Sequence, residues 1–174
     1  MAVLKVLTWG DPLLRKSSRA LEPHELDDAF RSWCADLTET MYDEEGVGLA
    51  AIQVGNPVRV LVVDIEHGET NAKNPVVYVN PVIEPHGAPC DDSEGCLSVP
   101  GVRGKVSRPE RVNISWLDVH GTAHRRENIE GLEARCLQHE MDHLEGVIFV
   151  DRLSPAARSL AEGKLRKLAR QNNA

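Results

Sequence analysis

The chain has 174 residues, of which 41% are hydrophobic and 27% charged, proportions typical of a globular protein long enough to bury a core. Its formal net charge of −7 argues against a general nucleic-acid-binding protein, so no DNA partner is expected. No apolar run approaches the roughly 18 residues of a membrane span, and the first nine residues are too soon interrupted for a secretory signal. We therefore expect one domain over residues 1–174, in the cytoplasm and without membrane contact.

The first 45 residues predict an extended N-terminal arm followed by an amphipathic helix. A short strand and a turn at Gly10 are expected first. A helix is predicted over 23–43, with Gly46 placed to end it. The helix is amphipathic because its apolar residues recur on one face: Leu26, Phe30, Trp33, Cys34, Leu37 and Met41. Cys34 is expected to be a buried core thiol, as free cysteines usually are.

The middle of the chain predicts short strands separated by polar loops. Loops are expected at 67–74 and 85–93, and a hairpin turn at 120–122. The segment 58–64 is a continuous apolar run, which predicts a strand with both faces covered. The predicted strands are 58–64, 76–79, 97–99, 104–107, 111–119 and 123–129.

Two further helices are predicted in the last third. The first spans about 130–144, with Gly146 just past its end, and apolar residues on two sides indicate that it is buried. The second starts after Ser154 as N-cap and runs to about Arg170, with an inner face of Leu160, Ala161, Leu165 and Leu168. The fold class is therefore α+β, with mainly antiparallel sheets packed around the helix at 130–144 and helices near both ends.

That central helix carries the pattern H-E-x-x-H in His139, Glu140 and His143. Histidines four positions apart lie on one face of a helix, one turn apart, and can bind one divalent metal. Glu140 follows the first histidine and can act as general base toward a water on that metal.

A catalytic site of this kind usually has three protein ligands and keeps its fourth position for water. No histidine follows His143, so two candidates for the third ligand remain. Glu162 lies on the later helix, where some metalloproteases carry a carboxylate ligand. Cys96 lies in a polar, glycine-flanked stretch that suits a site better than a core.

Three segments of the chain resemble the peptide deformylase family of bacterial type. They are Gly46 to Gln53, reading GVGLAAIQ; Glu94 to Ser98, reading EGCLS; and His139 to His143, reading HEMDH. Their order and separations also fit, and the family's length covers the whole chain. The resemblance implies a metal-dependent hydrolase that removes the formyl group from the N-terminal formylmethionine of newly made polypeptides and releases formate.

The resemblance also implies roles for individual residues. Cys96, His139 and His143 are expected to bind the metal, and Glu140 to be the catalytic acid/base. Gln53 and the backbone N–H of Leu97 are expected to hold the developing oxyanion. One divalent metal per chain is expected, Fe²⁺ in the cell, with Zn²⁺, Ni²⁺ or Co²⁺ as substitutes in the purified protein. Simple affinity order favours zinc over ferrous iron, so availability decides the choice.

The substrate-binding residues predicted around this centre are Gly46, Val47, Gly48, Gly95, Arg103, Leu132 and Cys136. Leu132 and Cys136 precede His139 by seven and three residues on the same helix face, so they can floor a pocket for the methionine side chain, with Val47 on a wall. The glycines permit an added peptide strand to approach the backbone closely. Core packing remains the alternative for Leu132 and Cys136, and a solvated surface position for Arg103.

Three alternatives stay open from the sequence. The basic C-terminal helix can be a docking patch for the ribosome or simply a solvated face. The site can be that of a zinc endopeptidase that uses His139, His143 and Glu162. It can also be a metal-stabilised binding module with no activity, in which Glu140 has no catalytic task.

Overall fold

The computed structural model describes residues 1–174 and has an α+β architecture, as predicted. Its four α-helices are α1 (Asp28–Asp43), α2 (Ile65–Thr70), α3 (Gly131–Leu144) and α4 (Pro155–Asn172). Four short 3-10 helices are η1 (Pro12–Arg15), η2 (Pro23–Glu25), η3 (Ala51–Val54) and η4 (Phe149–Arg152). No helix is both long enough and apolar enough to cross a bilayer.

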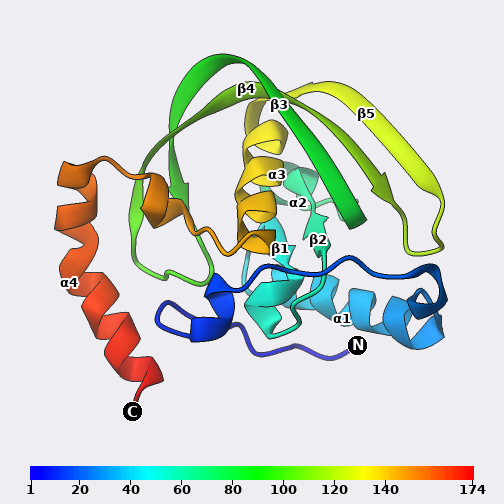
Figure 1. The fold of residues 1–174 in the computed structure, drawn as a ribbon, viewed down its shortest axis with the longest axis horizontal. Helices are drawn as coiled ribbons and strands as arrows, with labels where there is room; N and C mark the ends of the chain where they lie inside the picture. The colour runs from blue at the N-terminus through cyan, green and yellow to red at the C-terminus, as the bar shows by residue number, and fades with distance from the viewer.

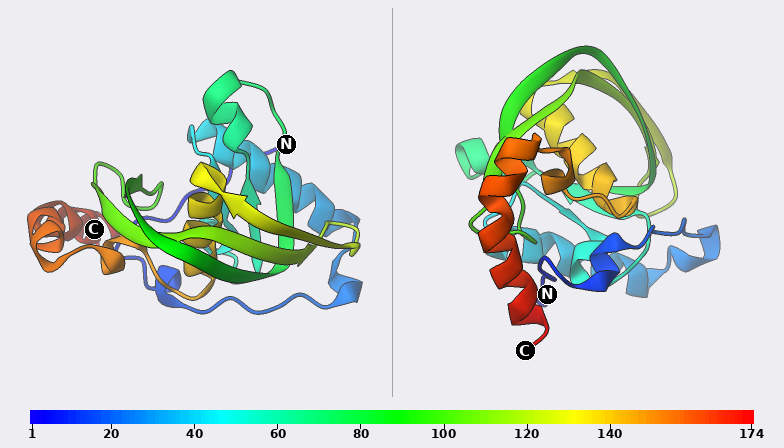
Figure 2. Two further views of the ribbon diagram at one scale, coloured as in Figure 1. Left: turned by 90° about the horizontal axis from the view of Figure 1, so that it is seen from above. Right: turned by 60° about the vertical axis from the view of Figure 1, so that its left-hand side comes forward.

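Five strands form one antiparallel sheet in sequence order, and α3 lies at the centre of the molecule (Figure 1). The strands are β1 (Gly48–Ala50), β2 (Val60–Val63), β3 (Val76–Gly95), β4 (Arg103–Leu117) and β5 (Ala123–Glu130). Figure 2 shows β3 and β4 as a long curved ribbon that arches over α3. The order leaves β1 at one edge of the sheet, beside α3.

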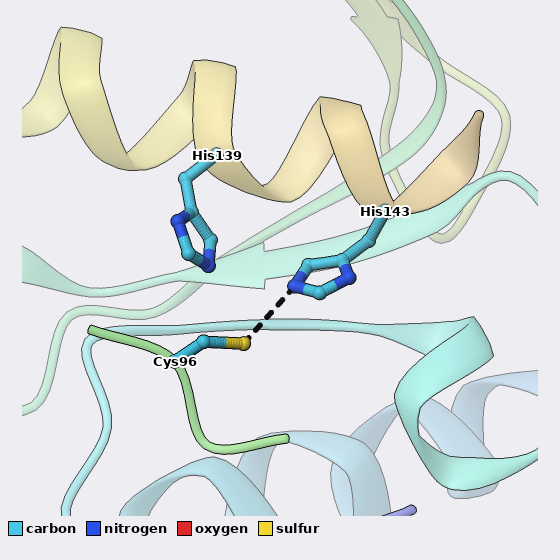
Figure 3. A group of neighbouring side chains, drawn as sticks. All are labelled: Cys96, His139 and His143. Carbon is cyan, nitrogen blue, oxygen red and sulfur yellow. Dashed lines mark hydrogen bonds between the residues drawn. The ribbon is translucent and has the colours of Figure 1, made fainter. Parts of the chain in front are cut away.

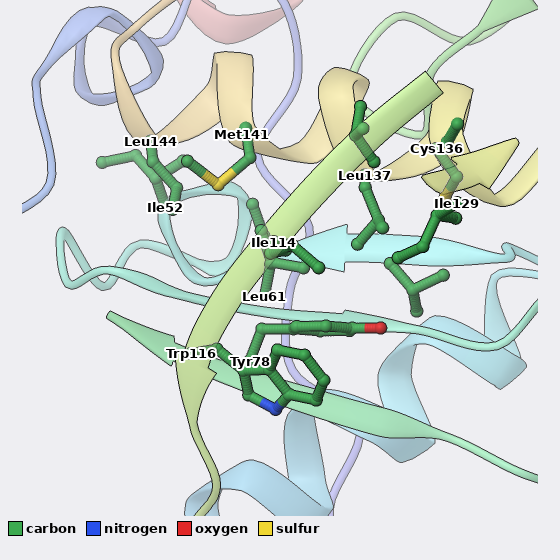
Figure 4. Close-up of a cluster of buried hydrophobic side chains, with 14 residues drawn as sticks. Ile52, Leu61, Tyr78, Ile114, Trp116, Ile129, Cys136, Leu137, Met141 and Leu144 are labelled. Carbon is green, nitrogen blue, oxygen red and sulfur yellow. The ribbon is translucent and has the colours of Figure 1, made fainter. Parts of the chain in front are cut away.

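The short strand β2 is buried on both faces, as its continuous apolar run predicted. Successive side chains of a strand point to opposite faces. Leu61 and Val63 therefore pack into the cluster under α3, whereas Val60 and Val62 pack against α1. Figure 4 shows the first of these clusters, to which α3 contributes its predicted apolar stripe of Leu137, Met141 and Leu144. Because both sides of α3 face other elements, the helix is held in a fixed position.

The ends of the helices follow the capping signals of the sequence, with two differences. Ser154 caps α4 by accepting from the Ala157 amide at 3.2 Å, and Gly146 follows α3 with a φ of 73°. However, α1 begins at Asp28, because Asp27 is its N-cap and the preceding residues form η2. The left-handed residue after α1 is Glu45, with a φ of 56°, and not Gly46.

Several sequence predictions about strands and loops are wrong. The expected loop at 85–93 belongs to β3, and the two strands expected at 104–107 and 111–119 are one strand, β4. The β3 part of this ribbon was missed because residues 85–93 are mostly polar and exposed, and Gly87 lies in a bulge between His86 and Pro89.

The remaining differences are local. Part of the expected loop at 67–74 is the helix α2, which Asp64 caps by accepting from the His67 amide. The segment 97–99 is a turn and not a strand, and the N-terminal arm pairs with no strand before η1. Within α4, Leu160 is 87% exposed, so only the other three residues of the predicted inner face are buried. Cys34 is buried, as expected.

Candidate metal centre

The two histidines of α3 project from one face of the helix toward the loop that follows β3 (Figure 3). Both are buried, and their ring centroids lie 5.2 Å apart. Burial lowers the pKa of His143 well below its usual range, and the neighbouring charges of His139 and Arg108 lower it further. The neutral imidazole is the form that binds a metal.

Cys96 reaches the same point from the opposite side, on the loop between β3 and β4 (Figure 3). Its Sγ lies 3.3 Å from Nε2 of His143, and the possible ligand atoms of Cys96, His139 and His143 all lie within 4.8 Å of one another. Ligands about 2.0–2.3 Å from one ion lie roughly 3.3–3.8 Å apart in a tetrahedron, so the cluster has the right size. One thiolate and two imidazoles are also a donor set that divalent transition metals accept.

Glu94 is a buried carboxylate behind His139, and nothing in the sequence beyond its place in the EGCLS segment marks it. It accepts from Arg108 at 2.6 and 2.8 Å, from Arg135 at 2.7 Å and from Nδ1 of His139 at 3.0 Å. Burial opposes its charge, but the hydrogen bonds from Arg108 and His139 outweigh burial and hold the pKa of Glu94 well below its usual value. Since Nδ1 of His139 faces Glu94, Nε2 is the ring nitrogen left for a metal.

Asp142 extends this ionic network along the outer side of α3. It accepts from Arg108 at 3.0 Å and from Arg152 at 2.6 and 2.8 Å. Arg108 therefore joins the carboxylate behind His139 to the residue that precedes His143, and it orients the helix face that carries both rings.

Glu140 is buried beside the histidines, and its Oε2 has no hydrogen-bond partner in the protein. Burial raises the pKa of its carboxyl group to about 7, with the charge of His139 opposing the rise and that of Glu94 adding to it. Gly48 of β1 leaves the space for this side chain: a Cβ on Gly48 would lie 2.8 Å from Oε1 of Glu140 and 2.7 Å from Sγ of Cys136.

Gln53 approaches the cluster from η3 and is almost completely buried. Its Oε1 accepts from the Ala50 amide at 2.9 Å, so its Nε2 is directed toward the site. There Nε2 donates to Oγ of Ser98 at 3.1 Å and lies 3.6 Å from Sγ of Cys96. In the sequence, Ser98 stands out only as the last residue of the EGCLS segment. Its contact with Gln53 spans 45 positions, so no local pattern reveals it.

A pocket of about 550 Å³ opens onto this cluster. It brings together all the substrate-binding residues that the sequence predicted, namely Gly46, Val47, Gly48, Gly95, Arg103, Leu132 and Cys136. Gln53, Cys96, Leu97, His139 and Glu140 also line it. Glu162 lies elsewhere, on the exposed side of α4, where it pairs with Arg158 and Arg166, each at 3.6 Å.

Three converging ligand atoms, an adjacent buried carboxylate and an open pocket define a mononuclear metal-dependent hydrolase. Residues 3–159 match the family model described as polypeptide deformylase. The chain is 45% identical to the peptide deformylase of Rhizorhabdus wittichii, with 100% of this chain and 99% of the relative covered. It belongs to the peptide deformylase family, hydrolases that remove the N-formyl group from newly made polypeptides.

The fold agrees with this assignment. The peptide deformylase of Legionella pneumophila superposes with a TM-score of 0.87 at 43% identity, over 99% of this chain and 98% of that one. The peptide deformylase of Synechococcus elongatus in complex with actinonin superposes with a TM-score of 0.82 at 38% identity, over 98% of this chain and 88% of that one. Both the family and the ligand cluster indicate a divalent metal.

Proposed function

We propose that Cys96, His139 and His143 hold the metal of this deformylase, and that it is Fe²⁺ in the cell. The observation that carries the proposal is the convergence of one sulfur and two ring nitrogens within 4.8 Å beside the buried carboxylate of Glu140. When bound, the cation supplies the Lewis acidity that makes a water nucleophilic near neutral pH. Zn²⁺, Ni²⁺ or Co²⁺ can replace iron at the same donor set in the purified protein.

In the proposed mechanism, Glu140 moves the proton. Its carboxylate takes a proton from the attacking water and returns it to the amine that leaves when the formyl C–N bond breaks. Without metal, burial raises the pKa of this carboxyl group to about 7, and a group that must accept and then release a proton works best when its pKa is near the working pH. Its unpaired Oε2 leaves an acceptor available for that proton.

Gln53 and the backbone N–H of Leu97 are the proposed donors to the oxygen of the formyl group as it gains charge. The Nε2 of Gln53 is held at the site by the contacts of its amide with Ala50 and Ser98. Leu97 follows Cys96 directly in the chain and lines the same pocket. Preorganised donors of this kind each lower a barrier by roughly 3–4 kcal/mol.

The methionine side chain of the substrate is proposed to lie against Leu132, Cys136 and Val47. These residues line the pocket together with Glu140, and Cys136 is buried while Leu132 is half exposed. The peptide that follows the methionine is proposed to add to β1, an edge strand that begins at Gly48, two residues after Gly46. Gly95 and Arg103 also line the pocket, where Arg103 is proposed to contact the peptide backbone.

The alternative of a zinc endopeptidase with Glu162 as third ligand is not favoured, because Glu162 is paired with two arginines on an exposed helix face. The test is metal content after replacing each candidate ligand. Cys96→Ala should lose the metal, and Glu162→Ala should keep one equivalent. The reverse result would support the endopeptidase, whereas loss of neither would remove both ligand assignments. Formate release from formyl-Met-Ala by the anaerobically prepared protein tests the activity in the same samples.

We also propose that residues 1–174 act as one catalytic domain in the cytoplasm and that α4 docks on the ribosome. The exposed side of α4 carries the basic residues Lys164, Arg166, Lys167 and Arg170, and the half-buried Arg158 lies on the same helix. Such a patch on an acidic chain complements the negative charge of RNA. Replacing Lys167 and Arg170 with glutamate should reduce co-sedimentation with ribosomes without unfolding the helix. Unchanged co-sedimentation would leave this side of α4 as a solvated surface.

A further inference from the structure

The N-terminal arm, residues 2–9, has no helix or strand and starts beside α1 (Figure 1). Its first half is tied to α1 through main-chain donors: the Ala2 amide donates to Asp36 at 2.7 Å and the Leu4 amide to Oγ1 of Thr40 at 2.8 Å. The arm therefore has a defined path before it reaches the catalytic segments.

In its second half, the arm makes one main-chain hydrogen bond to each of two segments that lie far apart in sequence. The Leu7 amide donates to the carbonyl oxygen of Gln53 at 2.7 Å, and the Trp9 amide donates to that of Ser98 at 2.7 Å. The Gln53 carbonyl lies near the end of η3, where carbonyls have no partner within the helix. The arm supplies that partner from outside.

These two segments carry the proposed oxyanion donors. Gln53 presents its side-chain amide, and the Ser98 segment presents the N–H of the preceding residue, Leu97. The segments also meet on the site side, where Nε2 of Gln53 donates to Oγ of Ser98 at 3.1 Å. Together, the arm's two bonds and this side-chain bond close a ring of hydrogen bonds around the donors.

The far end of the arm is anchored by the C-terminal helix. Nδ2 of Asn172 donates to the carbonyl oxygens of Thr8 at 2.9 Å and of Trp9 at 2.7 Å. The guanidinium groups of Arg15 and Arg158 both lie over the Trp9 ring, 4.9 and 5.2 Å from its centroid. The arm is thus fixed on both sides of the two bonds that it makes to the catalytic segments.

We propose that the N-terminal arm is a positioning element of the active site. In it, the amides of Leu7 and Trp9 hold Gln53 and the Ser98 segment, with the Leu97 N–H, in their places relative to each other. This inference rests on the oxyanion role proposed above for Gln53 and Leu97. Donors to a developing oxyanion must be placed within a fraction of an ångström, because a shift of about 1 Å costs on the order of a hundredfold in rate. Leu7 acts through Gln53 and touches no substrate.

The test is a double-mutant cycle between Leu7→Pro, which removes the amide donor, and Gln53→Ala, which removes the group it positions. Lys5→Pro is the matched control, because Lys5 lies in the same arm, is exposed, and its amide makes no hydrogen bond. Kinetics of formyl-Met-Ala hydrolysis are measured on metal-loaded proteins. Leu7→Pro should lower kcat about tenfold with KM within about twofold, and Lys5→Pro should leave both unchanged. In the Gln53→Ala background, Leu7→Pro should lower kcat less than about twofold.

The possible results separate the inference from the mechanism beneath it. If Leu7→Pro lowers kcat by the same factor in both backgrounds, its effect does not pass through Gln53, and the inference is overturned while the mechanism stands. If Gln53→Ala itself leaves kcat unchanged, the oxyanion role of Gln53 fails and the inference fails with it. Should Leu7→Pro not fold, the α-hydroxy acid of leucine at position 7 replaces the N–H with an ester oxygen, and an unchanged kcat in that protein overturns the inference.

Discussion

Replacing Glu94 with glutamine removes a single buried charge that two arginines and His139 share. The carboxylate accepts four hydrogen bonds, from Arg108, Arg135 and His139. A glutamine side chain has only one acceptor oxygen. Its NH₂ group would face the N–H groups of a guanidinium, and two donors cannot form a hydrogen bond. The variant therefore leaves Arg108, which is only 4% exposed, with part of its charge uncompensated.

The cost follows from the burial of the partners. Removing one member of a buried ion pair typically destabilises a protein by about 3–5 kcal/mol, since the remaining charge stays buried. Glutamine preserves the shape of the side chain, so we expect the lower end, about 3 kcal/mol. That loss shifts the urea midpoint by roughly 1.5 M for a protein of this size. Because Glu94 also orients His139, metal affinity should fall by about 10–100-fold.

The assay is urea unfolding of the metal-free protein at pH 7 and at lower pH, with Glu25→Gln as control. Glu25 also pairs with an arginine, Arg19, but at the surface, so its replacement should have a much smaller effect. The pKa of Glu94 is lowered in the folded state, so its contribution is complete above the unfolded-state pKa and is lost as the pH falls toward the folded-state pKa. The difference between wild type and Glu94→Gln should therefore be full at pH 7 and shrink below about pH 4.5.

Two results would refute this reasoning. One is a urea midpoint for Glu94→Gln that equals that of the wild type at pH 7. The other is a stability difference that grows as the pH falls below 4.5, because that would mean that the Glu94 carboxylate is not the stabilising form.

Three further predictions concern Gly48, Glu140 and the leucines of α4. Gly48→Ala should lower kcat on the order of a hundredfold, because the added Cβ would displace Glu140. The control Gly163→Ala, in an uncrowded position of α4, should keep full activity and gain up to about 1 kcal/mol in unfolding free energy. Equal activity of the two variants would contradict the crowding at Gly48. The Glu140 carboxyl group should titrate near pH 7 in the metal-free protein because of its burial, and at lower pH after zinc loading. Carbon-13 NMR, with the Glu140 signal assigned from Glu140→Gln, measures both titrations. A titration near pH 4 without metal would disprove the effect of burial. Leu165→Ala removes a buried side chain and should cost about 2–5 kcal/mol of unfolding free energy, measured by denaturation. Leu160→Ser changes an exposed side chain and should cost less than about 0.5 kcal/mol. A larger cost for Leu160→Ser would mean that Leu160 is not exposed.

The parts of the structure that the sequence predicted are those that depend on local patterns. The helix α3 was predicted within one residue of its bounds, because its apolar periodicity and the glycine after it are local signals. The spacing of His139 and His143 likewise predicted that both rings share one face. By contrast, residues 85–93 of β3 are almost all exposed and carry no alternation of apolar residues, so this part of the ribbon looked like a loop.

The contacts that complete the site depend on strand register and could not be predicted from local patterns. The choice between Cys96 and Glu162 stayed open on spacing alone, because both lie more than eighteen positions from the histidines. Glu94 pairs with Arg108 and Arg135 only because the hairpin register places Glu94 opposite Gly104 and the ribbon curves over α3. The positions joined are 14 and 41 residues apart, beyond the reach of any periodicity.

The most direct test of the proposed centre is to measure metal content and formate release together in Glu140→Ala, prepared anaerobically beside the wild type. The proposed mechanism separates metal binding by Cys96, His139 and His143 from proton transfer by Glu140. It predicts one metal per chain in both proteins and a kcat about 10²–10⁴-fold lower in the variant. A variant that keeps its metal and releases formate at the wild-type rate would contradict the central role of Glu140.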